Sequence, residues 1–177
     1  MALHHYPYHF VQRFEVSGGI ENNFLKSKIL YSFKSPKTHQ CYWVWVELYE
    51  HEFYAVKFHL KSHRHSDNKY SLMTGLNEAR PVIHTCIMIM LEIARNNPHA
   101  SFGFIGANMP EESTVMTKRF RVYSVMMATY FNETVFNHYV LLDKSAYLLV
   151  RKSEMEQNPD LLCELNRKFS QMYPFFD

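Results

Sequence analysis

The sequence predicts an α+β fold, a mainly antiparallel sheet whose strands come first and are followed by an α-β-α-β-β order and a last helix. Three observations predict it. Residues 9–60 contain several runs of period-two alternation, residues 80–97 and 112–131 carry apolar side chains at helical spacing, and residues 134–151 alternate again. Alternation with period two is typical of strands, and a period of 3.6 is typical of helices. The 177 residues show no repeat and no linker, so they predict one domain over 1–177.

Each early strand is bounded by a residue that interrupts it. The alternation of residues 9–17 ends at Gly18-Gly19, and that of residues 27–34 ends at Ser35-Pro36. Cys41–Tyr49 is apolar on both faces, which favours a strand covered on both sides. A short polar break separates it from a strand ending at Leu60, so the two are expected to form a hairpin.

The second half alternates helices and strands. Residues 61–79 are polar and predict a long loop before a helix that opens at Arg80-Pro81. The remaining elements, in order, are a short buried strand over 101–107, a helix beginning at Pro110, a hairpin of 134–141 with 145–151, and a helix after Asn158-Pro159-Asp160.

Composition excludes several classes of function. The formal charge is +2, which gives no strong field toward nucleic acid or a membrane. Only 5 glycines are present, and phosphate-cradling loops depend on glycine.

The N-terminus lacks the pattern of a signal peptide, and the longest apolar run, Cys86–Leu91, is too short to span a bilayer. Cys86 and Cys163 lie in apolar helical stretches as expected buried thiols, so we expect a cytoplasmic protein.

Two resemblances bear on the second half of the chain. Pro98 and Ala100, followed by the Arg119-x-Arg121-x-Tyr123 element, resemble a group of small bacterial proteins, mostly from Bacteroidetes, whose activity is uncharacterised. The resemblance covers roughly the C-terminal half, and this chain inserts several residues before the Arg-x-Arg element. It implies a β-rich first half and no particular activity.

The order strand, helix, strand, helix, strand, strand is similar to the back half of the GCN5-related N-acetyltransferases. That resemblance implies acetyl-CoA as cofactor and a tyrosine on the second helix, here Tyr123, as the acid that protonates the departing thiolate. In that superfamily a glycine-rich loop before the first helix binds the pyrophosphate. Residues 73–79 here contain a single glycine and the acidic residue Glu78, which departs from that pattern.

Glu47 is the residue most suited to act as a general base. It interrupts an otherwise apolar strand, and a partly buried carboxylate can have a raised pKa. The alternative is a position at the end or the edge of the sheet, since glutamate is seldom fully buried.

Lys118, Arg119 and Arg121 form the densest basic cluster. They could contact a phosphate or RNA, with Phe120 or Tyr123 as a stacking face, or they could be solvated cations on the polar side of a helix. His63 and His65 have spacing that suits a metal from a strand, but Arg64 between them argues against a cation site, and we predict no metal.

The leading hypothesis is a non-catalytic domain that binds a protein partner or assembles with itself. It depends on the scarcity of catalytic motifs in the sequence and on the 16% share of aromatic residues. Exposed aromatic side chains would mark such a surface, and the candidates are Trp43, Trp45, Phe53 and residues 173–176. An acyl-CoA-dependent N-acyltransferase that uses Tyr123 and Glu47 is the first alternative, and a module that binds RNA or a nucleotide is the second.

Overall fold

Seven strands make one sheet in a computed structural model that describes residues 4–16, 25–67, 69, 76–105, 118–141 and 146–172. The strands are β1 (Tyr8–Glu15), β2 (Leu25–Lys34), β3 (Cys41–Tyr49), β4 (Phe53–Leu60), β5 (Ser101–Ile105), β6 (Phe136–Leu141) and β7 (Ala146–Arg151). Their order in the sheet is β1-β2-β3-β4-β5-β7-β6. Only the β4–β5 pair is parallel. The predicted α+β class with a mainly antiparallel sheet is therefore confirmed.

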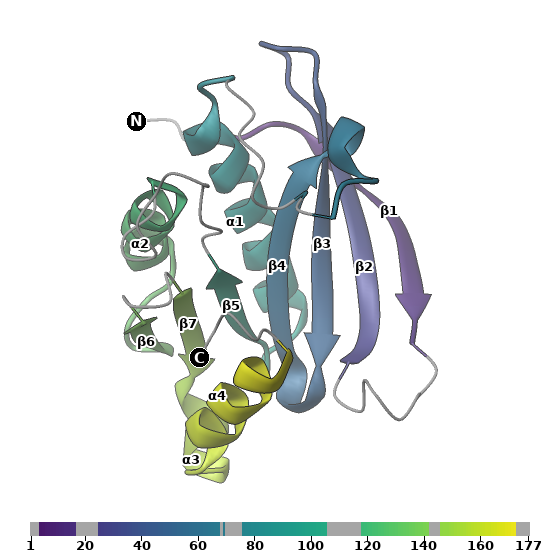
Figure 1. Ribbon diagram of the computed structural model, residues 1–177. Coiled ribbons are helices and arrows are strands. Elements are labelled where there is room, and N and C mark those ends of the chain that lie inside the picture. The colour runs from purple at the N-terminus through teal and green to yellow at the C-terminus, as the bar shows by residue number, and fades with distance from the viewer. Residues whose placement is uncertain are drawn as a thin grey trace.

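The helices connect and cover this sheet (Figure 1). They are the 3₁₀ turns η1 (Glu50–Glu52) and η2 (Lys61–His63), and the helices α1 (Ala79–Asn96), α2 (Lys118–Tyr130), α3 (Lys152–Gln157) and α4 (Leu161–Met172). A parallel pair needs a crossover connection, and α1 provides it between β4 and β5. None of the described helices is both long enough and apolar enough to cross a bilayer.

One element was not predicted, and the predicted ends of two others lie outside the described residues. The strand predicted to reach residue 107 is described only to Ile105, and the start of the helix predicted at residue 112 lies outside the described residues. The six residues of α3 were not predicted, because so short a helix has no apolar period to reveal it. The predicted β3–β4 hairpin is confirmed, with Tyr42 opposite Leu60 and Tyr49 opposite Phe53.

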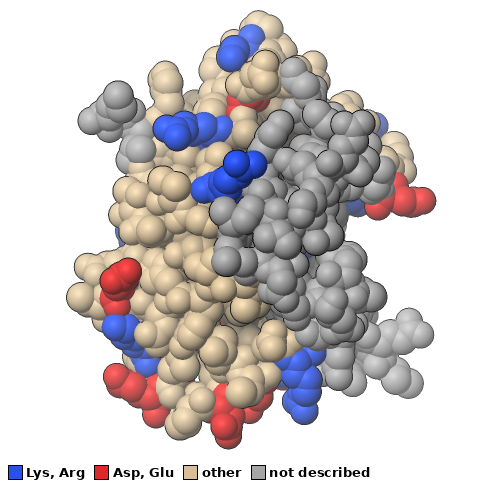
Figure 2. Space-filling view, turned by 60° about the vertical axis from the view of Figure 1, so that its left-hand side comes forward, with Lys and Arg blue, Asp and Glu red and all other residues tan. Residues whose placement is uncertain are grey.

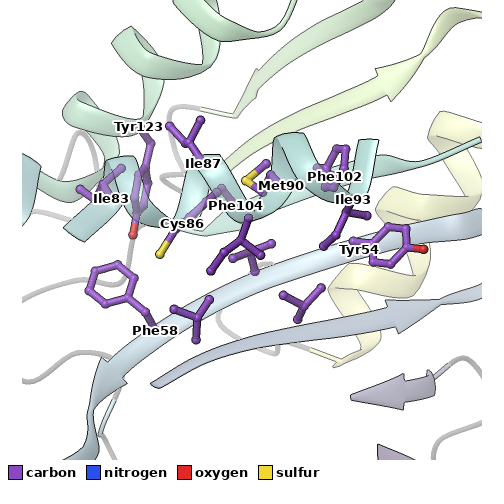
Figure 3. Packing of buried hydrophobic residues seen from close by; sticks show 14 of the residues in the cluster. Tyr54, Phe58, Ile83, Cys86, Ile87, Met90, Ile93, Phe102, Phe104 and Tyr123 are labelled. Atoms are coloured by element: carbon purple, nitrogen blue, oxygen red, sulfur yellow. The ribbon is translucent and has the colours of Figure 1, made fainter. Parts of the chain in front are cut away.

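A hydrophobic core on each face holds the sheet between the helices. The larger core joins α1 and α2 to β2–β5 and to β7, and Figure 3 shows the part between α1, α2, β4 and β5. The predicted stripe of α1 supplies Ile83, Cys86, Ile87, Met90 and Ile93, all of them buried. The smaller core lies on the opposite face, where Leu161 and Leu165 of α4 pack with Phe53, Ala55 and Leu148.

The N-terminal segment, residues 4–8, is bonded along α1. The backbone N–H of Tyr6 donates to Thr85 Oγ1 at 2.9 Å, and His84 Nδ1 lies 3.0 Å from the carbonyl oxygen of His4. The hydroxyl of Tyr8 donates to Glu92 Oε2 at 2.6 Å. These bonds place the chain that enters the edge strand β1 against a helix far along the sequence.

Gly103 lies where the smaller core leaves no room for a side chain. A Cβ atom at this position would lie 2.6 Å from Cζ of Phe53 and 3.3 Å from Cδ2 of Leu148. Phe53 is fully buried, so its ring has little space to withdraw. We expect Gly103→Ala to lower the free energy of unfolding by about 1–3 kcal/mol, measured by denaturant unfolding. Phe53→Leu should reduce that loss in a double-mutant cycle, and equal losses in both backgrounds would contradict the steric cause.

Candidate functional site

Tyr123 and Glu47, the predicted acid and base, lie on opposite faces of the sheet. Tyr123 comes from α2 and is buried in the larger core, with its ring 4.0 Å from that of Phe104 between centroids. Figure 3 shows its hydroxyl oxygen pointing into the layer between α1 and the sheet, on the side of Phe58. Glu47 lies opposite Ala55, which belongs to the smaller core. The structure therefore does not bring these two side chains together at one substrate.

The start of α1 is occupied by a carboxylate of the protein itself. Glu78 is 3% exposed, and the hydroxyl groups of four side chains donate to it: Tyr6 (3.1 Å), Ser35 (2.6 Å), Thr38 (2.9 Å) and Tyr42 (2.9 Å). Burial alone would raise the pKa of Glu78, but these hydrogen bonds outweigh it and leave the pKa lowered. A negative charge is thus already fixed where the acetyltransferase resemblance would require a bound pyrophosphate.

The predicted basic cluster is described only in part. The side chains of Lys118 and Arg119 lie outside the described residues, and Arg121 is exposed on α2. On the face drawn in Figure 2, the coloured Lys and Arg side chains form small separate groups, several of them beside Asp or Glu. The described residues of this face therefore give no continuous basic patch.

No metal site emerges from the residues that the structure describes, because they contain no group of three His, Cys, Asp or Glu side chains arranged to hold an ion. Cys41, Cys86 and Cys163 form no disulfide in the part of the chain that the structure describes: Cys86 is buried as expected, but Cys163 is exposed. The expectation for Cys163 was wrong, since its position on α4 faces away from the stripe formed by Leu161 and Leu165.

A second face of the sheet carries the most concentrated set of functional side chains. In β1–β4, residues that alternate with those of the larger core point away from α1. Helix α4 covers one end of this side at β4, β5 and β7, with Met155 of α3 packed beside it, and the turn η2 lies at the other end, where Lys61 approaches Trp43 (Figure 1). We call the remaining surface the open face and define it by Phe14, Lys28, Trp43, Trp45, Lys57 and Lys61.

Aromatic rings cross the open face from β1 to β4. Phe14, 39% exposed, lies 5.9 Å from the ring of Trp45, and Trp45 lies 6.2 Å from Trp43 at an interplanar angle of 88°. The indole N–H of Trp45 donates to Nε2 of His59 at 3.2 Å, and Nδ1 of His59 lies 2.8 Å from the carbonyl oxygen of Leu60. Both ring nitrogens of His59 are therefore engaged, which fixes a neutral tautomer and leaves no nitrogen to act as a base.

Glu47 sits beside this row in an ion pair with Lys57, and it also accepts a hydrogen bond of 2.8 Å from the Tyr49 hydroxyl. Lys28 faces Glu47 across the β2–β3 pair. The carboxylate oxygens of Glu47 are therefore already engaged by a cation and a hydroxyl of the protein itself. The alternative of a position on an edge strand is wrong, since β3 is paired with β2 and β4, and Glu47 lies two residues before the end of β3.

The sequence contains the information that places these side chains together. Alternation places Trp43, Trp45 and Glu47 in one row of β3, and places Lys57 and His59 in one row of β4. The hairpin register sets Trp43 opposite His59 and Trp45 opposite Lys57. Of the other predicted aromatic residues, Phe53 is fully buried rather than exposed, because α4 packs over it, and residues 173–176 lie outside the described residues.

Two buried histidines make stability depend on pH. Burial lowers the pKa of His59 and of His84 below 6.5. Nε2 of His84 is buried and has no hydrogen-bond partner among the described residues. As pH falls below about 6.5, these histidines bind protons in the unfolded chain before they do so in the folded protein, so the free energy of unfolding decreases. We expect a loss approaching about 1 kcal/mol per pH unit for each histidine, down to its folded pKa.

The measurement is the free energy of unfolding of the wild type and of His59→Asn/His84→Asn at pH 7.5, 6.5 and 5.5, values that span about one unit either side of the reference pKa. The double variant should be less stable at high pH and show a shallower decrease toward low pH. Equal slopes in the two proteins would contradict the assignment to these histidines.

Comparison with known proteins adds no relative: no family model matches the chain, and no curated protein or solved structure matches it either.

Proposed function

We propose that this protein is a non-catalytic binding domain whose open face contacts a protein partner or a second copy of the chain. The observation that carries the proposal is the row of half-exposed aromatic side chains, Phe14, Trp45 and Trp43, on the part of the sheet between α4 and the turn η2. Tryptophan and other aromatic residues are enriched at the centres of protein interfaces.

The chemistry of the surrounding groups supports binding rather than catalysis. His59 has both nitrogens engaged, and Glu47 is neutralised by Lys57. Tyr123, the one predicted acid, lies on the other side of the sheet. A rigid sheet surface with large aromatic side chains loses little side-chain entropy on association, which favours affinity.

The test compares what the wild type and a Phe14→Ser/Trp43→Ala variant retain from a lysate of the source cells, with light scattering of each purified protein. We expect at least one protein, or a second copy, to bind the wild type and to be lost from the variant, since truncation of central aromatic residues commonly costs about 2 kcal/mol or more. The purified partner should then bind the wild type alone in solution.

Val125→Ser is the matched control, because Val125 is an exposed apolar residue on α2, away from the open face. It should retain the same partner as the wild type. Identical retention by all three proteins, or a monomer with no retained partner, would contradict the proposal. Circular dichroism establishes that the double variant is folded.

A second candidate is an acyl-CoA-dependent N-acyltransferase, and one observation favours it. The parallel strands β4 and β5 pair from Phe53–Ser101 to Val56–Phe104, and the helix α1 connects them. The element order β4-α1-β5-α2-β6-β7 is the order that the acetyltransferase resemblance implies. Glu78 at the start of α1 counts against the candidate, because its charge would repel a pyrophosphate.

Thermal-shift titrations with acetyl-CoA and with coenzyme A decide between the two. Binding to the native state raises the melting temperature, by an amount set by ligand concentration relative to Kd. A higher melting temperature with either ligand would support the second candidate. Turnover of acetyl-CoA by the wild type should then be reduced in Tyr123→Phe. The binding-domain proposal expects no shift with either compound.

A further inference from the structure

We propose that the partner of the open face is an acidic protein segment, an inference that rests on the proposed binding function. The surface combines lysines with aromatic rings, and it has few carboxylates to neutralise them. An acidic chain with some apolar side chains would satisfy both features: carboxylates would meet the lysines, and apolar groups would cover the rings.

Positive charge is concentrated on this side of the sheet. The strand residues that alternate onto it include Lys28, Lys34 and Lys57, and the structure describes a single carboxylate among them, Glu47. Lys28 and Lys57 flank that carboxylate from β2 and β4. The ammonium of Lys61 lies 5.7 Å from the ring centroid of Trp43 and adds a fourth cation.

The lysines are close enough to disfavour one another. Burial lowers the pKa of Lys57, and the nearby charges of Lys28 and Lys69 lower it further, against the effect of Glu47. Like charges held together reduce the stability of the free protein, and an anion placed among them would remove this repulsion. Relief of the repulsion among these lysines would therefore favour the binding of an acidic partner.

The same charges argue against a second copy as the occupant. A two-fold dimer sets the same surface of both chains together, so the lysines of one open face would approach a second surface that carries the same excess of positive charge. Single-stranded nucleic acid is also less favoured. Bases stack on free ring faces, but Trp43 lies under Lys61 and stands perpendicular to Trp45.

The protein contains its own reporter for the test. Its two tryptophans, Trp43 and Trp45, both lie on the open face, so intrinsic tryptophan fluorescence reports on this surface alone. The titration uses poly-L-glutamate as the acidic probe, and oligo(dT) of equal net charge and poly-L-lysine as comparison probes. Each titration is repeated at about 0.05 M and about 0.5 M NaCl, where the Debye length falls from more than 10 Å to less than 5 Å.

We expect poly-L-glutamate to change the fluorescence saturably at low salt, at least about tenfold more tightly than at high salt. Lys28→Glu/Lys61→Glu should weaken this binding by at least about tenfold. Arg121→Glu is the control, because it makes the same change of charge at one exposed site on α2, on the other side of the sheet. Its affinity for poly-L-glutamate should stay within about twofold of the wild type.

Two results would overturn the inference: no response to poly-L-glutamate, or tighter binding of oligo(dT) than of poly-L-glutamate. These outcomes differ from failure of the proposed function. A partner retained through Phe14 and Trp43 but insensitive to Lys28→Glu/Lys61→Glu would keep the binding domain and reject the acidic partner.

Discussion

Glu78→Ala is expected to lower the free energy of unfolding by about 3–5 kcal/mol. Four hydroxyl groups, from Tyr6, Ser35, Thr38 and Tyr42, donate to this buried carboxylate. Its removal leaves buried donors without an acceptor, and it also removes a negative charge near the positive end of α1. Denaturant unfolding at neutral pH measures the loss.

Two comparison variants separate the causes. Glu78→Gln keeps the shape and removes the charge, so it should lose about half as much, since hydrogen bonds to a charged group are roughly twice as strong as neutral ones. Thr38→Val removes one half-buried donor and should lose only about 1 kcal/mol. If Glu78→Ala proved no worse than Thr38→Val, the loss of all four hydrogen bonds to Glu78 would not explain its effect.

The lowered pKa of Glu78 gives this cluster a pH signature of its own. The carboxylate contributes stability above the pKa of the unfolded chain, about 4.5, and the contribution is lost as pH falls through the lower folded value. The loss begins near pH 4.5, whereas that of His59 and His84 begins near pH 6.5, so the additional decrease in stability below about pH 4.5 should be absent from Glu78→Gln.

Phe102→Ala is expected to lower the free energy of unfolding by about 3–5 kcal/mol. Phe102 is fully buried on β5, and its ring centroid lies 5.7 Å from Tyr54, 5.8 Å from Phe131 and 6.4 Å from Phe136. The substitution would open a cavity where β4, β6 and the end of α2 meet. Cavity cost depends on how far the neighbours can collapse, and rings packed on one another collapse poorly.

Phe102→Leu should lose clearly less, because it retains most of the buried apolar volume. Phe10→Ala is the surface control: its side chain is 57% exposed on the edge strand, and its removal should change stability by less than about 0.5 kcal/mol. Equal losses at Phe102 and Phe10 would show that the two cores do not determine stability.

Hydrophobic periodicity predicted the individual helices and strands well. It did not predict contacts between segments that are far apart in the sequence. The alternation in 41–49 and the apolar stripe of 80–97 located β3 and α1, because each pattern is complete within its own segment. The parallel pairing of β4 with β5 is a relation between distant segments, so no local period reports it. The same limit explains why the faces of Tyr123 and Glu47 were not distinguished.

The Glu78 cluster illustrates that limit most clearly. Its members come from the N-terminal segment, from the β2–β3 turn, from β3 and from the residue before α1. In sequence, Glu78 is one acidic residue in a polar loop, and solvated acidic residues are common there. The open face was closer to prediction, since the register of a single hairpin brings Trp45, Lys57 and His59 together.

The attachment of the N-terminal segment to α1 has a consequence for how the chain acquires its structure during synthesis. Tyr6 bonds Thr85, 79 residues later, and Tyr8 bonds Glu92, 84 residues later. The meander β1–β4 can form from neighbouring segments while translation continues, but its first residues have no helix to dock on until α1 leaves the ribosome. We therefore expect the β1–β4 meander to form on the ribosome while the N-terminal segment is still undocked. That segment would dock on α1 only in the second half of translation.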